Sequence, residues 1–279
     1  MKVIKIKTAD YYEITATIFE PANPNGKLLL INSATGVRQQ TYYDFAKYFS
    51  EKGYITITYD YRGISLSKPE KLKGFKASMR IWGNTDYKAL TDFIKEHYPD
   101  ERKFLIGHSV GALILGMNQN STIFERFCFV ATQNTYFGHL KPMVKALSIV
   151  GFGLYQPVIT RAIGYFKSYF VNLGETLPKG VSDDWRTLLM NKKSVNKLLE
   201  KTPNFATNLT QEVLYLHLED DDWITEKGMR LLMEDTFSNM KPVYRTIKVS
   251  EGTGEKIGHI NFFRAKHAQL WDIVLDWFS

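Results

Sequence analysis

The amino-acid sequence predicts an α/β fold in which a mostly parallel central sheet is flanked by helices and carries a helical insertion. Three observations support this prediction. Short segments that are apolar throughout alternate with amphipathic helical segments, which is typical of a parallel sheet covered by helices. The alternation stops between residues 135 and 205 and then resumes. A turn with serine between two glycines joins one of the strands to the helical segment after it.

The first half of the chain gives the more regular pattern. Segments 3–9 and 11–19 alternate polar and apolar residues and predict an antiparallel pair of strands at the start. The helical segments that follow end where helices usually end, at a glycine or a proline. The expected elements are strands at 27–34, 54–62, 103–108 and 126–132, and helices at 41–53, 86–99 and 110–117.

The second half begins with the interruption. Residues 135–205 contain no convincing strand, and their many aromatic residues recur at irregular helical spacings. We therefore expect a core at 1–134 and 206–279, and a helical cap at 135–205 inserted after the sixth strand. The later elements of the core are expected as strands at 212–218 and 242–250, and helices at 225–237 and 265–278.

Length and composition fit one globular domain with an insertion. The chain has 279 residues, of which 44% are hydrophobic and 23% charged. Cys128 is the only cysteine, so an internal disulfide is excluded and a reducing, cytoplasmic location is the simpler expectation. The net charge is +7, but the basic residues are scattered, and we find no zinc spacing or nucleic-acid-binding motif. We expect neither a metal ion nor a nucleic acid as a partner, and the sequence leaves the oligomeric state open.

No segment of the sequence predicts a signal peptide or an integral membrane span. The first fourteen residues alternate lysine with apolar residues and contain no continuous apolar stretch. The longest apolar region, 146–159, is flanked by Lys145 and Arg161 and interrupted by Pro157, so we expect it to be too short to span a bilayer. A helix that lies in a membrane interface remains an alternative for this region.

Ser109 is the candidate nucleophile. The string Gly107-His108-Ser109-Val110-Gly111 fits the G-x-S-x-G pattern and stands where a strand ends and a helix begins. This chemistry needs a serine in a strained turn, and small residues two positions before and after it let the helix approach the strand. The Val110 amide at the start of that helix can stabilise an oxyanion. The alternative is an ordinary structural serine.

His259 is the candidate general base. It lies in a glycine-bearing loop between the last strand and the final helix, where an imidazole can reach the carboxyl edge of the sheet. The other five histidines lie on helices, within a strand, inside the insertion or at a variable position of the serine turn; they are His97, His108, His139, His217 and His267.

The acid that orients this base should lie between the serine and the histidine in the chain. Four carboxylates, residues 219–222, follow directly after the strand expected at 212–218. We choose Asp221. Asp220 and Asp222 remain alternatives, because the pattern alone does not separate the three aspartates.

With GHSVG after one strand, DDDWIT after a later strand and GHINFFR before the last helix, the chain resembles the α/β-hydrolase superfamily. Asp60-Tyr61-Arg62-Gly63 resembles the D-x-R-G turn of monoglyceride lipases and serine aminopeptidase-like hydrolases. The whole chain is similar to a group of bacterial predicted α/β hydrolases within that branch. The resemblance implies an α/β-hydrolase fold, a Ser-His-Asp triad and a helical cap over the active site.

Two site residues depend on this resemblance. In that branch the acid stands four residues before a proline or threonine, as Asp221 does before Thr225, which supports the choice of Asp221. Many relatives carry His-Gly after the strand that precedes the first core helix, whereas this chain has INSATGV at 31–37. The resemblance implies that the second oxyanion amide comes from this loop; we expect Thr35, with Ala34 as the next choice.

The sequence therefore predicts a serine hydrolase that cleaves an ester-type bond of a small or lipophilic acyl substrate through an acyl-enzyme, without a cofactor. An acyl thioesterase is the first alternative, because the loop 67–80 holds four lysines and an arginine that could contact a phosphorylated carrier. An aminopeptidase comes second, since the insertion offers few carboxylates to hold a substrate ammonium. A binding protein with a hydrolase fold is the alternative from another class.

Overall fold

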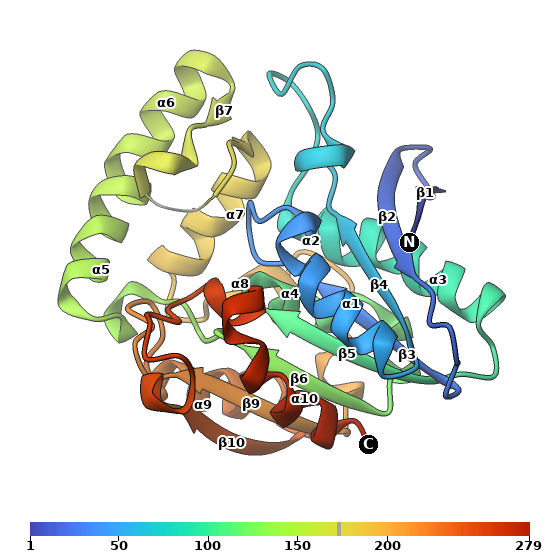
Figure 1. The fold of residues 1–279 in the computed structure, drawn as a ribbon. Helices are drawn as coiled ribbons and strands as arrows, with labels where there is room; N and C mark the ends of the chain where they lie inside the picture. The colour runs from blue at the N-terminus through green and yellow to red at the C-terminus, as the bar shows by residue number, and fades with distance from the viewer. Residues whose placement is uncertain (172–173) are drawn as a thin grey trace.

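An eight-stranded sheet forms the centre of the computed structural model, which describes residues 1–171 and 174–279 (Figure 1). The strand order is β1-β2-β4-β3-β5-β6-β9-β10. β2 pairs antiparallel with β1 and β4, and the remaining neighbours pair parallel. The strands are β1 Lys2–Lys7, β2 Glu13–Phe19, β3 Lys27–Asn32, β4 Tyr54–Asp60, β5 Arg102–His108, β6 Arg126–Val130, β9 Glu212–Leu218 and β10 Lys241–Ile247.

Helices cover both faces of this sheet. α1 and α10 lie on the near face in Figure 1, and α3 lies behind the sheet. The rings of Phe45 in α1 and Trp271, just before α10, meet edge to face at 5.2 Å between centroids, which joins the two near helices. The core helices are α1 Tyr43–Glu51, α2 Met79–Ile81, α3 Lys88–His97, α4 Val110–Leu113, α9 Glu226–Asp235 and α10 Asp272–Trp277.

The predicted α/β fold and the antiparallel start of the sheet are confirmed. The central strands could be predicted because they are buried on both faces. Residues 28–31 of β3 have no exposed surface, so apolar side chains are needed on both sides of the sheet. Three strands end two residues earlier than expected, at Asn32, Asp60 and Val130. The residues that follow these ends form the carboxyl edge of the sheet.

Two expected helices are shorter than the sequence suggests. The helix expected at 110–117 is the four-residue α4 followed by a 3₁₀ turn, Leu115–Met117. In that turn Gly116 lies against Ala206, and a Cβ on Gly116 would come within 2.8 Å of the Ala206 Cβ. The helix expected at 265–278 begins as a 3₁₀ segment, Ala265–Leu270, in which His267 departs from helical backbone angles.

Residues 135–171 and 174–205 form a layer over the carboxyl edge of the sheet (Figure 1). Their main element is a continuous 22-residue helix, Pro142–Ile163, built from α5 Pro142–Ser148, a π-helical segment Ile149–Tyr155 and α6 Gln156–Ile163. This helix is longer than the apolar region 146–159 because the residues on both sides continue it. By length and composition alone it could cross a membrane. α7 Lys179–Met190 and α8 Val195–Leu199 follow.

A two-stranded hairpin also lies in this layer, although we expected no strand there. β7 Tyr165–Phe166 pairs antiparallel with β8 Leu177–Pro178. Each strand has two residues, which is too short to produce an alternating pattern that sequence analysis could detect.

Candidate active site

Ser109 stands in a strained turn between β5 and α4. Its backbone angles are φ +53° and ψ −118°, a conformation that residues other than glycine rarely adopt. Its amide donates to the carbonyl of Val130 at 2.9 Å, so the end of β6 holds the turn in place. Ser194 in the cap has similar backbone angles, so Ser109 is distinguished by this strain together with its place in the same cavity as His259.

Both glycines around Ser109 are needed for close packing. A Cβ on Gly111 would come within 2.3 Å of the backbone oxygen of Asn32, at the end of β3. A Cβ on Gly107 would lie 2.7 Å from the Cα of Ala112 in α4. The first turn of α4 therefore sits directly against two strand ends, as the G-x-S-x-G spacing predicts.

The structure brings Asp221 and His259 together. His259 Nδ1 lies 2.8 Å from Asp221 Oδ2, and the Trp223 amide donates to the other carboxylate oxygen at 2.8 Å. Asp221 is fully buried, whereas His259 remains 22% exposed. Burial alone would raise the pKa of Asp221, but the His259 imidazole and the Trp223 amide outweigh burial and lower this pKa below its ordinary value.

The neighbouring aspartates have other partners. Asp220 accepts the amides of Ile257 and Gly258, both at 2.8 Å, and so fixes the backbone of the loop that carries His259. Asp222 forms an exposed ion pair with Lys256 at 3.1 Å. Of the three aspartates that the sequence left open, Asp221 is therefore the one that contacts the imidazole.

The loop after β3 contains the two amides that were considered for an oxyanion site. The Ala34 amide donates to the Tyr42 hydroxyl at 2.9 Å and is therefore already used. The amides of Thr35 and Val110 donate to no other group within residues 1–171 and 174–279. Trp185 of α7 donates its indole N–H to Thr35 Oγ1 at 3.0 Å, which ties the cap to this loop.

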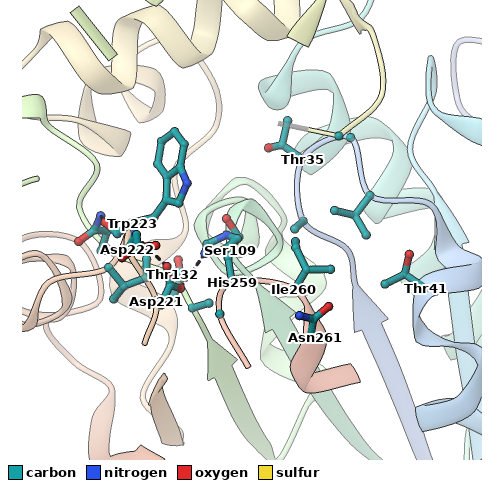
Figure 2. Close-up of a pocket in the computed structure, with 18 of the residues that line it drawn as sticks. Thr35, Thr41, Ser109, Thr132, Asp221, Asp222, Trp223, His259, Ile260 and Asn261 are labelled. Atoms are coloured by element: carbon teal, nitrogen blue, oxygen red, sulfur yellow. Dashed lines mark hydrogen bonds and ion pairs between the residues drawn. The ribbon is translucent and has the colours of Figure 1, made fainter. Parts of the chain in front are cut away.

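A cavity of about 590 Å³ joins these groups. Ser109 and His259 lie together in its middle, between Asp221 on one side and Thr35 on the other (Figure 2). Leu113, Trp185, Trp223, Ile224 and Ile260 supply apolar parts of its wall. The lysines of the loop 67–80 do not line it. In the described part of the chain, no cluster of three or more His, Cys, Asp or Glu side chains could hold a metal ion.

Residues 24–119 match a family model described as serine aminopeptidase, S33. This stretch includes β3, β4, β5 and the Ser109 turn. Solved structures match almost the whole chain. The chain has the α/β-hydrolase fold of these structures. Among curated proteins, none matches this sequence.

The similar structures include several esterases. A thermostable carboxyl esterase from Bacillus coagulans, in complex with glycerol, has a TM-score of 0.68 and 11% identity, with 99% of this chain and 97% of that chain covered. Est1E from Butyrivibrio proteoclasticus, with ferulic acid bound, has a TM-score of 0.64, 15% identity and coverages of 99% and 97%. An esterase from Exiguobacterium antarcticum has a TM-score of 0.60, 13% identity and coverages of 98% and 98%. At such identities the likeness shows the fold.

Sequence analysis missed one residue of this site, His108, which it assigned to a variable position of the turn. His108 is fully buried, and its Nε2 lies 2.8 Å from the His259 carbonyl oxygen. A carbonyl only accepts, so Nε2 carries the proton and Nδ1 accepts from the Tyr42 hydroxyl at 2.7 Å. Burial, and then the nearby His259, lower the pKa of His108 to about 3, which keeps it neutral. Its polar neighbours lie far away in sequence, so no local pattern could have identified it.

The D-x-R-G turn, residues 60–63, makes structural contacts near the site. Arg62 is buried and pairs with Asp86 at 2.6 Å and with Asp10 at 2.5 Å. Asp60 accepts the backbone and side-chain N–H groups of Gln39, both at 2.8 Å. Because Gln39 follows the loop that contains Thr35, Asp60 helps to hold that loop on the sheet.

Proposed function

We propose that this α/β-hydrolase is a serine esterase of small or lipophilic acyl substrates, with Ser109 as the nucleophile, His259 as the general base and Asp221 as the acid that orients it. The observation that carries the proposal is the 2.8 Å contact between His259 Nδ1 and Asp221 Oδ2, in a cavity that also contains the strained Ser109. The family match supports hydrolysis, while the substrate class rests on the cavity.

In the first half of the reaction, Ser109 Oγ attacks the carbonyl carbon of the ester while His259 takes its proton. Buried Asp221 stabilises the imidazolium that forms and keeps Nδ1 protonated. The free amides of Val110 and Thr35 donate to the oxyanion. His259 returns the proton to the leaving alcohol, and an acyl-Ser109 remains. Water, activated by His259, then releases the acid and restores the serine.

The cavity walls favour an ester with an apolar acyl group. Tryptophan and aliphatic side chains lie beside the pair formed by Ser109 and His259 (Figure 2). An aminopeptidase would need a free carboxylate for the substrate ammonium. Glu175 is the cap carboxylate that lines the cavity, and it accepts the Ser65 amide at 3.1 Å with Arg38 at 3.8 Å. Because Glu175 already has these partners, we rank peptide hydrolysis below ester hydrolysis.

The first experiment is active-site labelling with a fluorophosphonate, read by intact mass. Wild type should gain one adduct, Ser109→Ala none, and His259→Ala an adduct at a much lower rate. Hydrolysis of p-nitrophenyl esters of increasing acyl length is then compared with acyl thioesters and aminoacyl amides. A wild type that neither labels nor hydrolyses any of these substrates would contradict the proposal and favour a binding protein.

A further inference from the structure

The 22-residue helix of the cap, Pro142–Ile163, carries a row of apolar side chains on its outside, in addition to the buried Val144 and Phe152. The outer side chains recur every three or four residues and form one stripe along the helix, which lies at the outer edge of the molecule in Figure 1. We call these residues the outer stripe: Met143, Leu147, Val150, Leu154 and Val158, which are 75%, 50%, 57%, 66% and 67% exposed.

The inner face of the same helix contains three buried polar residues beside the apolar Val144 and Phe152. Ser148, Gln156 and Thr160 are 2%, 1% and 3% exposed. Gln156 donates to Ser182 and Asp183 in α7, at 3.1 Å and 2.7 Å, and these bonds fix which face of the helix points inward. A helix on a water-exposed protein surface has the opposite arrangement, with polar residues outside. The orientation therefore suits an apolar partner outside the cap.

From Leu147 to Val158 the outer stripe is also free of charge. The chain has no charged residue between Lys145 and Arg161, and Arg161 is exposed three residues after Val158. Single exposed apolar residues are ordinary on protein surfaces, but a continuous row of five marks an interaction surface. A water-facing helix of this length would normally carry charged residues on its outer face.

A cationic loop lies at the end of the outer stripe. Residues 68–76 hold Lys68, Lys71, Lys73 and Lys76, which are all exposed, against one acid, Glu70. Lys73 touches the helix end: a Cβ on Gly164 would lie 2.8 Å from Lys73 Cγ. Figure 1 shows this loop at the top of the molecule, near α6 and β7. These lysines lie outside the cavity lining, so their charge is presented at the surface.

We propose that the outer stripe and the 68–76 loop form a docking surface for an anionic lipid membrane. The apolar side chains enter the boundary between headgroups and acyl chains, and the lysines contact the anionic headgroups. The helix lies along the membrane surface and does not span it, because Gln156 and Thr160 remain packed inside the cap. Arg161 and the lysine heads reach the headgroup level from the ends of the stripe.

The lysines decide between a membrane and a second copy of this chain. The residues 135–205 carry ten Lys or Arg and four Asp or Glu, a balance of +6, and the adjoining 68–76 loop adds further positive charge. Two such faces would repel each other, whereas an anionic bilayer attracts each of them. The proposal does not depend on the catalytic assignment, because no residue of the docking surface lines the cavity.

The test is flotation of the full chain with lipid vesicles. One set contains phosphatidylcholine alone, and the other contains about one third phosphatidylglycerol, to supply the negative surface potential. Wild type should float with the anionic vesicles, and added salt should weaken this binding. Leu154→Glu/Val158→Glu should reduce the bound fraction at least about tenfold, because two charges would enter the acyl boundary. Lys71→Gln/Lys73→Gln should weaken binding to the anionic vesicles alone.

Val3→Glu/Val243→Glu is the matched control. It places two glutamates at valines that are 54% and 47% exposed on β1 and β10, far from the cap, and should leave flotation unchanged. All three double variants should keep the wild-type rate on a water-soluble ester. Absence of wild-type flotation with anionic vesicles would overturn the proposal. So would a concentration-dependent dimer, seen by sedimentation, that Leu154→Glu/Val158→Glu separates while flotation stays unchanged.

Discussion

The carboxyl edge of the sheet and the cap helix Pro142–Ile163 differ in how their polar and apolar side chains are distributed. At the sheet edge, the buried side chains of Asp221 and His108 meet polar partners, Asp221 with His259 and His108 with Tyr42. In the helix Pro142–Ile163, polar residues also lie inside, but apolar residues such as Leu154 replace them outside. α3 shows the ordinary case for comparison, with Leu90 and Ile94 buried.

This difference shows that burial of polar groups has two distinct causes in one chain. At the sheet edge, the buried hydrogen bonds position chemistry, and the surrounding apolar core strengthens them. In the cap, the buried polar residues fix the rotation of a helix and leave its apolar stripe outside. We therefore expect substitutions at the sheet edge to change activity and stability strongly, and matched substitutions in the cap to change them little.

The largest contrast is between two serines. Ser109→Ala should lower kcat/KM by about 10⁵-fold or more, because the nucleophile is lost. Ser148→Ala, in the buried face of the cap helix, should leave kcat/KM unchanged, since Ser148 Oγ has no hydrogen-bond partner within the described residues. Steady-state ester hydrolysis measures both. A Ser109→Ala variant with near wild-type activity would remove the catalytic proposal.

The next contrast is between two buried carboxylates. Asp221→Asn should lower kcat by about 10³-fold to 10⁴-fold with little change in KM, because the amide favours the wrong tautomer of His259. Asp184→Asn in α7, which loses an ion pair of 3.1 Å with Arg80, should leave kcat within about threefold. Asp220→Asn is a second control. It should lower kcat by an intermediate amount, because it loosens the loop that carries His259 without contacting the imidazole. An equal effect of the three substitutions would contradict the assignment.

The pH dependence of stability tests the buried His108. The pKa of His108 is about 3 in the folded chain, below the ordinary value of 6.5. Between these two pH values the unfolded chain binds a proton at His108 and the native state does not. The contribution of His108 to stability is therefore fully present above about pH 6.5 and is lost as the pH drops toward 3, by an amount on the order of 5 kcal/mol. Denaturant unfolding at several pH values measures this fall.

Two variants show which bond of His108 matters. His108→Gln keeps a donor for the His259 carbonyl, whereas His108→Asn keeps an acceptor for Tyr42. Both should remove this histidine's share of the pH dependence. If His108 positions the base, His108→Gln should retain kcat better than His108→Asn. Equal losses of kcat would show that His108 acts only as packing.

Two glycines give a smaller contrast in stability. Gly111→Ala should lower the free energy of unfolding by about 3 kcal/mol, because its Cβ would collide with the Asn32 oxygen. Gly153→Ala in the cap helix has its nearest neighbour at 3.9 Å and should be neutral or stabilise by up to about 1 kcal/mol. Thermal and denaturant unfolding of both variants measure the difference. A destabilising Gly153→Ala would show that the cap is packed as tightly as the sheet edge.

The smallest expected effect concerns the outer stripe in the absence of lipid. Leu154→Glu should change the free energy of unfolding by less than about 0.5 kcal/mol, because Leu154 is 66% exposed. Leu113→Ala at the sheet edge should cost about 2 to 5 kcal/mol, because Leu113 is only 2% exposed. A large loss in Leu154→Glu would show that this residue is covered in solution, for example by a second copy.

The sequence by itself determined the alternation of strands and helices, the turn around Ser109 and the loop that carries His259. These features depend on local spacing: apolar periodicity, a glycine two residues from a serine, and a histidine between a strand and a helix. It also narrowed the acid to three neighbouring aspartates. The structure brings Asp221 to His259, although pattern alone could not separate it from Asp220 and Asp222.

Only the tertiary structure decided which groups meet across the chain. Asp221 differs from its neighbours because its carboxylate faces the imidazole, and this direction depends on how two distant loops pack. The same holds for His108, whose partners lie 66 and 151 residues away. The orientation of the helix Pro142–Ile163 could not be predicted from the sequence either. Apolar spacing shows that a helix has two faces, but it does not show which face turns inward. That choice is made by contacts with α7, and contacts between distant segments leave no local pattern in a sequence.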